Sequence, residues 1–157
     1  MSESVYYLKK YANEIVPGVW VGNKSACGYA NMLGMKSICV LEWECYTPGC
    51  IHKPILPELQ DGWVGISSVL VDPDLLNEAI DAIEYYKSLG PILVHCGAGM
   101  ERSPLATAAW MVRHYGCTLD ESYNLLKEKR PIVEDRRSWL GLNKAADSAR
   151  AFLASND

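Results

Sequence analysis

Residues 91–113 read PILVHCGAGMERSPLATAAWMVR, and the organisation of the whole chain can be argued from them. The apolar run Ile92–Val94 has the length of a buried strand. After a loop that contains two glycines, apolar side chains recur on one side of a helix: Leu105, Ala108, Ala109, Val112 and Tyr115. Gly116 stands where such a helix would end. The stretch therefore predicts a strand, a loop and a helix in that order.

Cys96 falls between this predicted strand and helix, where unpaired N–H groups carry about half a positive charge. A cysteine at a helix N-terminus loses its proton more readily than a free cysteine, and the thiolate is the nucleophile. Arg102 adds a planar fork of donors that fits two phosphate oxygens. The glycines let the backbone aim its amides inward, so we expect an anion cradle built from Gly97, Ala98, Gly99, Met100, Glu101 and Arg102. A nucleophile at its floor predicts phosphoryl transfer to sulfur.

The pattern His95-Cys96-(five residues)-Arg102-Ser103 resembles the signature of the cysteine-dependent protein phosphatases, and of their dual-specificity branch in particular. Residues 14–22 are similar to that family's opening hairpin, and residues 129–132 to its late turn. The resemblance implies one catalytic domain over residues 1–157. It also implies hydrolysis of phosphotyrosine, and of phosphoserine or phosphothreonine, through a phosphocysteine, with no cofactor or metal. The structural alternative is a buried cysteine that merely ends a core strand.

The proton donor to the leaving group has three candidates. The resemblance implies an aspartate after the strand that precedes the signature, and Asp72 is the first choice because it directly follows Val71. It lies 24 residues before Cys96, a shorter gap than the family usually has. Asp74 is the second candidate, although it is well placed to cap the following helix. Glu101 is the third, and its alternative is a solvent-facing carboxylate at a helix start.

Two neighbours of the nucleophile are candidates for supporting roles, that of Ser103 by resemblance. The Ser103 hydroxyl would stabilise the departing thiolate when water cleaves the phosphocysteine, and a helix N-cap is a compatible alternative. His95 would tune the thiolate through hydrogen bonds or serve as a buried structural residue. Arg136, Arg137 and Lys129 would line a rim that steers a phosphorylated partner, or form a solvated face.

Composition predicts an ordinary single globular domain. The 157 residues are 49% hydrophobic and 22% charged, which is enough for a sizeable core. The net charge of −4 argues against a general nucleic-acid binder. We find no apolar run long enough to span a membrane and no signal-peptide pattern, so we expect a cytoplasmic monomer.

Other segments alternate between strand and helix patterns. We predict strands at residues 15–22, 37–43 and 63–71, and helices from about 23 to 34, 74 to 89, 118 to 129 and 135 or 136 to 155. Residues 118–121 match a capping box. Residues 1–13 have no clear period, and residues 45–62 resemble a long surface loop. The alternation favours an α/β fold with a mostly parallel sheet covered on both faces, and ligands bind such sheets at the carboxyl ends of their strands, where Cys96 lies.

The six cysteines suit reduced thiols rather than a disulfide framework. Cys45, Cys50 and His52 form a loose cluster, but zinc needs four ligands and no fourth is apparent in the sequence. A reversible disulfide between Cys96 and Cys45 is a further hypothesis that the family suggests.

Three rival functions remain open. A phosphate-binding pseudophosphatase would capture phosphoprotein without turnover. An enzyme that handles sulfur or arsenate would use a similar loop, although the signature spacing favours a phosphatase. Action on phosphoinositides or RNA 5′ ends is disfavoured because the loop contains no lysine.

Overall fold

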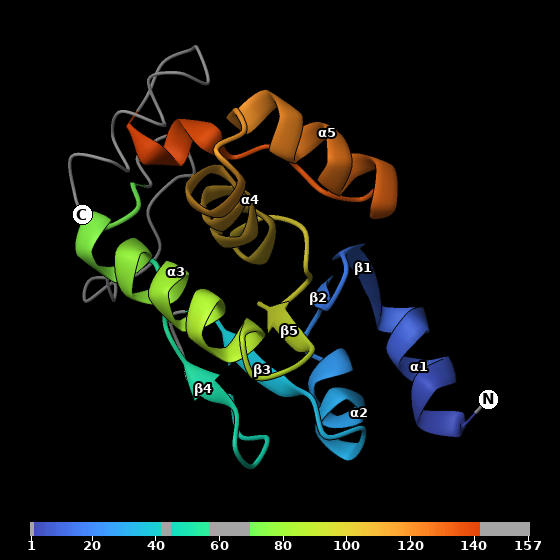
Figure 1. Ribbon diagram of the computed structural model, residues 1–157. Coiled ribbons are helices and arrows are strands. Elements are labelled where there is room, and N and C mark those ends of the chain that lie inside the picture. The colour runs from blue at the N-terminus through green and yellow to red at the C-terminus, as the bar shows by residue number, and fades with distance from the viewer. Residues whose placement is uncertain (1, 42–44, 57–69, 142–157) are drawn as a thin grey trace.

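The computed structural model describes residues 2–41, 45–56 and 70–141. Its helices are α1 (Glu3–Tyr11), α2 (Ala26–Met32), α3 (Pro73–Lys87), α4 (Arg102–Tyr115), α5 (Leu119–Lys129) and a short 3-10 helix (Arg137–Leu140). Its strands are β1 (Ala12–Val16), β2 (Val19–Gly22), β3 (Lys36–Cys39), β4 (Ile51–His52) and β5 (Ile92–His95). Figure 1 shows the strands crossing the middle of the molecule between two groups of helices.

The five described strands form one mixed sheet in the order β1-β2-β5-β3-β4. The first two strands make an antiparallel hairpin, whereas β2–β5, β5–β3 and β3–β4 pair in parallel. Gly18, with φ +83°, lies in the turn of the hairpin. β5 therefore lies at the centre of the sheet, and its carboxyl end opens into the loop that carries Cys96. The predicted α/β fold is confirmed.

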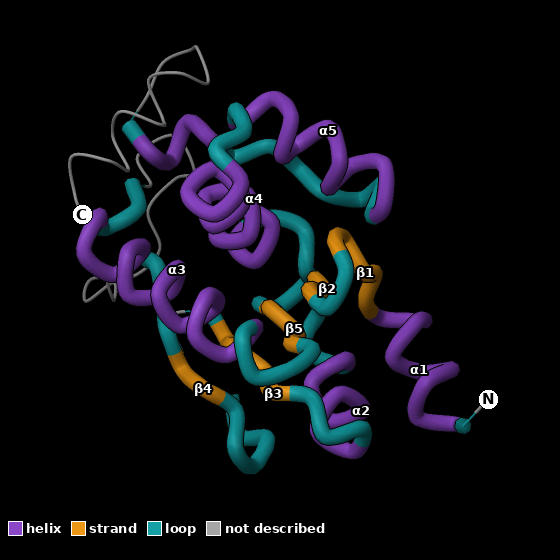
Figure 2. Tube along the Cα trace, in the orientation of Figure 1, coloured by secondary structure: helices purple, strands orange, loops and turns teal. Residues whose placement is uncertain are grey.

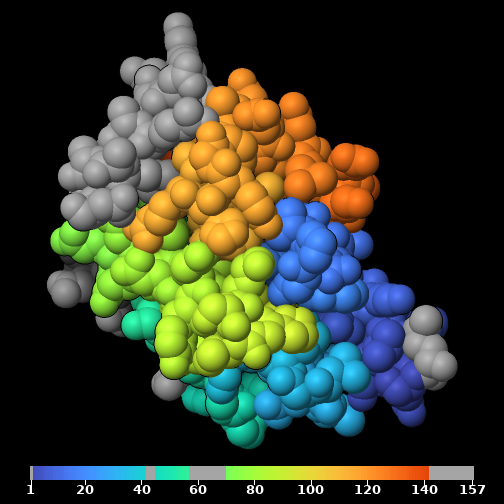
Figure 3. Space-filling view, in the orientation of Figure 1, coloured from blue at the N-terminus to red at the C-terminus, as the bar shows by residue number. Residues whose placement is uncertain are grey.

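Helices cover both faces of the sheet (Figure 2). Side chains of β5 alternate between two cores: Ile92 and Val94 belong to the larger one beneath α3, α4 and α5, and Leu93 belongs to the smaller one beneath α1 and α2. All three are fully buried, which explains why β5 reads as a continuous apolar run. In the space-filling view the blue N-terminal part of the chain lies directly against the orange part after the signature (Figure 3).

The helix after the signature is more deeply buried than its sequence pattern predicts. Ten consecutive residues of α4, from Ser103 to Val112, are buried, because the helix lies between the sheet and its neighbours α3 and α5. Tyr115, which we expected on the inward side, is half exposed, and Trp110 is fully buried instead. Gly116 ends the helix in the left-handed conformation, as predicted.

The N-terminal segment and the predicted loop differ from expectation. Residues 3–11 form α1, which Ser2 caps by accepting a hydrogen bond from the Val5 amide. Only Leu8 of this helix is buried. Tyr7 stacks on Tyr29 at a centroid distance of 5.1 Å. The helix therefore lacks the periodic apolar face from which a helix is predicted. Within the predicted loop at residues 45–62, Ile51 and His52 form β4 at the edge of the sheet.

The remaining predicted elements have mixed outcomes. The capping box of α5 is confirmed: the Glu121 amide donates to Thr118 Oγ1 at 3.1 Å, and the Thr118 amide donates to the Glu121 carboxylate at 2.9 Å. Most of the predicted strand at 63–71 and of the predicted C-terminal helix lies outside the described residues. Among the residues that the structure describes, no helix has both the length and the apolar character needed to cross a bilayer.

Candidate active site

The loop after β5 is held by its carbonyl groups. The Gly97 carbonyl accepts a hydrogen bond from the Lys24 amide at 3.0 Å, and the Met100 carbonyl accepts one from the Glu134 amide at 2.8 Å. Within the described chain, the N–H groups of residues 97–101 have no protein acceptor. Because the carbonyls bind the surrounding protein, the amides remain available for an anion at the centre of the loop.

Arg130 holds the next two carbonyls of the loop. Its Nε donates to the Gly99 carbonyl at 2.9 Å, its Nη2 to the Ala98 carbonyl at 3.3 Å and its Nη1 to Asn13 Oδ1 at 2.9 Å. The residue is only 5% exposed, and this burial lowers the pKa of the guanidinium, while the nearby Cys96 acts on that pKa in the opposite direction. Arg130 belongs to the family-like turn at residues 129–132, and its local sequence indicates no further role.

Gly99 is required by geometry. Its φ is +72°, and a Cβ at this position would come within 2.6 Å of the Gly22 carbonyl and of Arg130 Nη2. Both the backbone conformation and the packing therefore exclude a side chain here. Gly97 differs, because a Cβ there would meet open space.

Cys96 lies at the floor of this loop, with its side chain buried. Its Sγ lies 3.3 Å from Ser103 Oγ, in the first turn of α4. Ser103 does not cap the helix, because Glu101 occupies the N-cap position. A hydroxyl at this distance can donate a hydrogen bond to a thiolate, and the loop, the thiol and the helix N-terminus converge on one point.

Arg102 begins α4, and its guanidinium lies over the Trp139 ring, 5.7 Å from the ring centroid. The same tryptophan accepts a hydrogen bond from the Val71 amide through its carbonyl at 2.8 Å. Trp139 therefore connects the signature arginine to the segment that leads into α3. Trp139 could not be recognised from the sequence, because nothing local distinguishes it from an ordinary core tryptophan.

The first-choice acid, Asp72, directly follows Val71 and caps α3. Its Oδ1 accepts hydrogen bonds from the Asp74 amide at 2.9 Å and the Leu75 amide at 3.1 Å. The N-cap that the sequence analysis offered to Asp74 therefore belongs to Asp72, and Asp74 lies exposed in the first turn. Both of these capping bonds use Oδ1, and neither uses Oδ2.

The third acid candidate, Glu101, is held in an ion pair. Its Oε2 lies 2.7 Å from Arg136 Nε, and Arg136 also contacts the Glu134 carboxylate. The Glu101 carboxylate is therefore already engaged with a guanidinium. The contact also means that the positive charge of Arg136 is balanced by two carboxylates.

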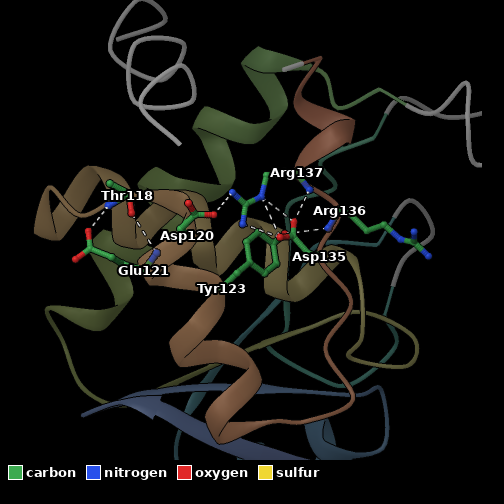
Figure 4. Close-up of polar contacts among 7 residues, drawn as sticks. All are labelled: Thr118, Asp120, Glu121, Tyr123, Asp135, Arg136 and Arg137. Carbon is green, nitrogen blue, oxygen red and sulfur yellow. Dashed lines mark hydrogen bonds and ion pairs between the residues drawn. The ribbon is translucent and has the colours of Figure 1, made fainter. Parts of the chain in front are cut away.

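The predicted basic rim is largely neutralised. Figure 4 shows Arg137 directed toward Asp135 and Asp120, with its guanidinium over the Tyr123 ring and Arg136 pointing away. The distances are 2.7 Å to Asp135 Oδ2 and 2.5 Å to Asp120 Oδ1, and the bond to Asp135 raises the pKa of Arg137. Burial raises the pKa of the Tyr123 hydroxyl. These contacts fix the turn after α5 rather than leave Arg137 open to a ligand.

Known proteins resemble this chain in both sequence and structure. The family model described as dual specificity phosphatase, catalytic domain, matches residues 71–146. Human dual specificity protein phosphatase 1 is 38% identical over 134 residues, which are 82% of this chain and 35% of that protein. The chain belongs to the dual-specificity phosphatase family. Mouse dual specificity protein phosphatase 2 is 28% identical over 138 residues, which are 82% of this chain. The chain spans 40% of the length of that relative.

Solved dual-specificity phosphatases share the fold. Human DUSP28 superposes with a TM-score of 0.63 at 20% identity, over 92% of this chain and 93% of that one. A mouse putative dual specificity phosphatase, solved as a complex with zinc tungstate, superposes with a TM-score of 0.66 at 20% identity, over 92% of this chain and 87% of that one.

Proposed function

We propose that this chain is a phosphomonoester hydrolase that acts on phosphoproteins through a phosphocysteine intermediate. One observation carries the proposal: the Cys96 thiol lies beneath a loop whose carbonyls are all bound to the surrounding protein, so that the amides can receive a phosphoryl group. Membership of the dual-specificity phosphatase family supports it. Phosphotyrosine, phosphoserine and phosphothreonine are the proposed substrate residues.

In the proposed first step, the Cys96 thiolate attacks phosphorus, the S–P bond forms and the bond to the leaving oxygen breaks. The loop amides and the Arg102 fork stabilise the equatorial oxygens. Asp72 gives its proton to the leaving oxygen. In the second step, water attacks the phosphocysteine, Asp72 takes the proton of that water, and Ser103 donates a hydrogen bond to the departing thiolate, to which it lies 3.3 Å away.

Three features support Asp72 over the other acid candidates. It is joined through Val71 to Trp139, which lies under the Arg102 guanidinium. Its Oδ2 is not used by the two capping bonds. Glu101, in contrast, is paired with Arg136.

The test is a rapid-mixing assay with an aryl phosphate, followed by acid-quench mass spectrometry. The wild-type chain should release a burst of aryl alcohol of about one equivalent and carry one phosphoryl group on Cys96. Cys96→Ser should abolish turnover but still bind inorganic phosphate. Cys117→Ser is the matched control, because this half-buried thiol bonds Ser122 and Met111, and it should keep full activity. A burst that survives Cys96→Ser would overturn the proposal.

A phosphate-binding pseudophosphatase is the second candidate. The observation in its favour is that Asp72 already caps α3, which would leave the site short of an acid. An aryl phosphate with a good leaving group needs little help from an acid, so inactivity on that substrate combined with phosphate binding would select this candidate.

A further inference from the structure

A second cluster of reactive side chains lies behind the catalytic loop. Cys27, Cys45, Cys50 and His95 present their ligand atoms within 4.8 Å of one another. Cys27 comes from the first turn of α2, Cys45 and Cys50 from the segment before β4, and His95 from the end of β5. Three parts of the chain that are remote in sequence thus converge on one point.

Two distances inside the cluster match a tetrahedral metal centre. Ligands at about 2.3 Å for sulfur and about 2.05 Å for nitrogen, separated by tetrahedral angles, lie about 3.8 Å (S–S) and about 3.6 Å (S–N) apart. Cys45 Sγ lies 3.8 Å from Cys27 Sγ, and Cys50 Sγ lies 3.5 Å from His95 Nε2. A disulfide would use two of the thiols and requires an S–S separation of about 2.05 Å.

The orientation of the histidine also favours a metal. His95 is 1% exposed, and its Nδ1 lies 3.3 Å from the Cys96 carbonyl. If Nδ1–H donates to that carbonyl, the Nε2 lone pair faces the thiols. Metal-bound histidines usually have this arrangement, in which one ring nitrogen binds the metal and the other donates a hydrogen bond. Without a metal, the partner of this buried Nε2 is a thiol, which is a weak hydrogen-bonding group.

We propose that this cluster binds one structural zinc ion, with all four ligands supplied by the protein: Cys27, Cys45, Cys50 and His95. Three sulfurs and one imidazole in a tetrahedron suit Zn²⁺. Each cysteine that enters as a thiol gives up its proton when its S–Zn bond forms, so binding releases up to three protons and weakens in acid. The filled site carries a net charge of −1.

The proposed ion would tie α2 and the 45–50 segment to the residue that directly precedes the nucleophile. His95 would then be fixed by the metal on one side and by the Cys96 carbonyl on the other. The site could not be recognised from the sequence, because His52, the histidine nearest in sequence to Cys45 and Cys50, is not a proposed ligand. Its Nε2 lies 3.0 Å from the Leu41 carbonyl instead.

The test uses the chain with Cys96→Ser, so that the catalytic thiol cannot contribute. Metal is removed with a chelator under reducing conditions, and Co²⁺ is added as a spectroscopic substitute for Zn²⁺. We expect about one equivalent of tight binding, with tetrahedral d–d bands and a thiolate-to-cobalt charge-transfer band. Zn²⁺ should displace the cobalt and raise the thermal midpoint of unfolding.

Cys45→Ser and Cys50→Ser, each on the same background, should weaken Co²⁺ binding by on the order of a hundredfold or more. Cys117→Ser and His52→Asn are the matched controls outside the cluster, and they should leave the bands unchanged. If a ligand variant does not fold, the wild-type midpoint with and without Zn²⁺ still decides the matter.

Two results would overturn the proposal. The first is reduced protein that gives no charge-transfer band and no zinc-dependent shift of the midpoint. The second is protein purified in the presence of zinc in which mass spectrometry finds a disulfide between Cys27 and Cys45, because the cluster would then be a redox pair. Neither result would bear on the phosphatase proposal, since no readout here depends on turnover.

Discussion

Replacing Arg130 with methionine tests whether the signature loop, residues 96–102, is held in place by the Arg130 side chain. The variant keeps most of the buried stem and removes the donors to the Ala98 and Gly99 carbonyls and to Asn13 Oδ1. Three hydrogen bonds from a charged donor are worth about 5–9 kcal/mol together, but removing a buried guanidinium also recovers a desolvation cost of several kcal/mol. Burial of the Arg130 guanidinium lowers its pKa through the same desolvation. We therefore expect the free energy of unfolding to fall by about 1–3 kcal/mol.

Turnover by Arg130→Met should fall by a larger factor than its loss of folding stability would cause. A cradle displaced by about 1 Å costs about a hundredfold in rate, because the amides no longer face the phosphoryl oxygens. We expect kcat on an aryl phosphate to fall about tenfold to a hundredfold in protein that remains folded. Urea unfolding followed by circular dichroism gives the stability, and saturating substrate gives kcat.

Arg113→Met is the matched control. Arg113 lies near the far end of α4, where it donates to Asp81 at 2.5 Å and to Asn77 at 2.7 Å. Losing this surface pair should lower the free energy of unfolding by less than about 1 kcal/mol and leave kcat unchanged. The reasoning is refuted if Arg130→Met is destabilised as expected but keeps kcat within about twofold of the wild type, less than a displaced cradle would cost.

Three further changes have expected outcomes. Asp72→Asn keeps a good N-cap, so the free energy of unfolding should not change. Turnover of substrates with poor leaving groups should fall far more than turnover of substrates with good ones, and equal slowing across a leaving-group series would exclude Asp72 as the acid. Gly99→Ala should lower the unfolding free energy by about 2–4 kcal/mol, because its Cβ would meet the Gly22 carbonyl at 2.6 Å, whereas Gly97→Ala should cost less than about 1 kcal/mol; equal costs in urea unfolding would contradict this. Thr118→Ala should cost about 1 kcal/mol in the same assay, and no loss would show that the capping box of α5 contributes nothing.

Interactions over a few residues were readable from the sequence. The capping box at Thr118 and the helix end at Gly116 are confirmed, because a cap is made by side chains and amides three or four positions apart. The apolar run before Cys96 forms β5, since a strand buried on both faces needs apolar residues at every position. The helix α1 was missed because its contacts are tyrosine stacking on α2 rather than a periodic apolar face.

The signature loop and the helix that follows it could be predicted from local sequence, because the spacing of Cys96 and Arg102 and the glycines between them act over a few residues. The contacts that hold that loop come from distant parts of the chain and become visible only in the fold. Arg130 reaches it from the end of α5, and Cys27 meets His95 because α2 packs against β5. Such contacts depend on the order of strands in the sheet and on helix packing, which bring distant residues together and leave no fixed spacing along the chain.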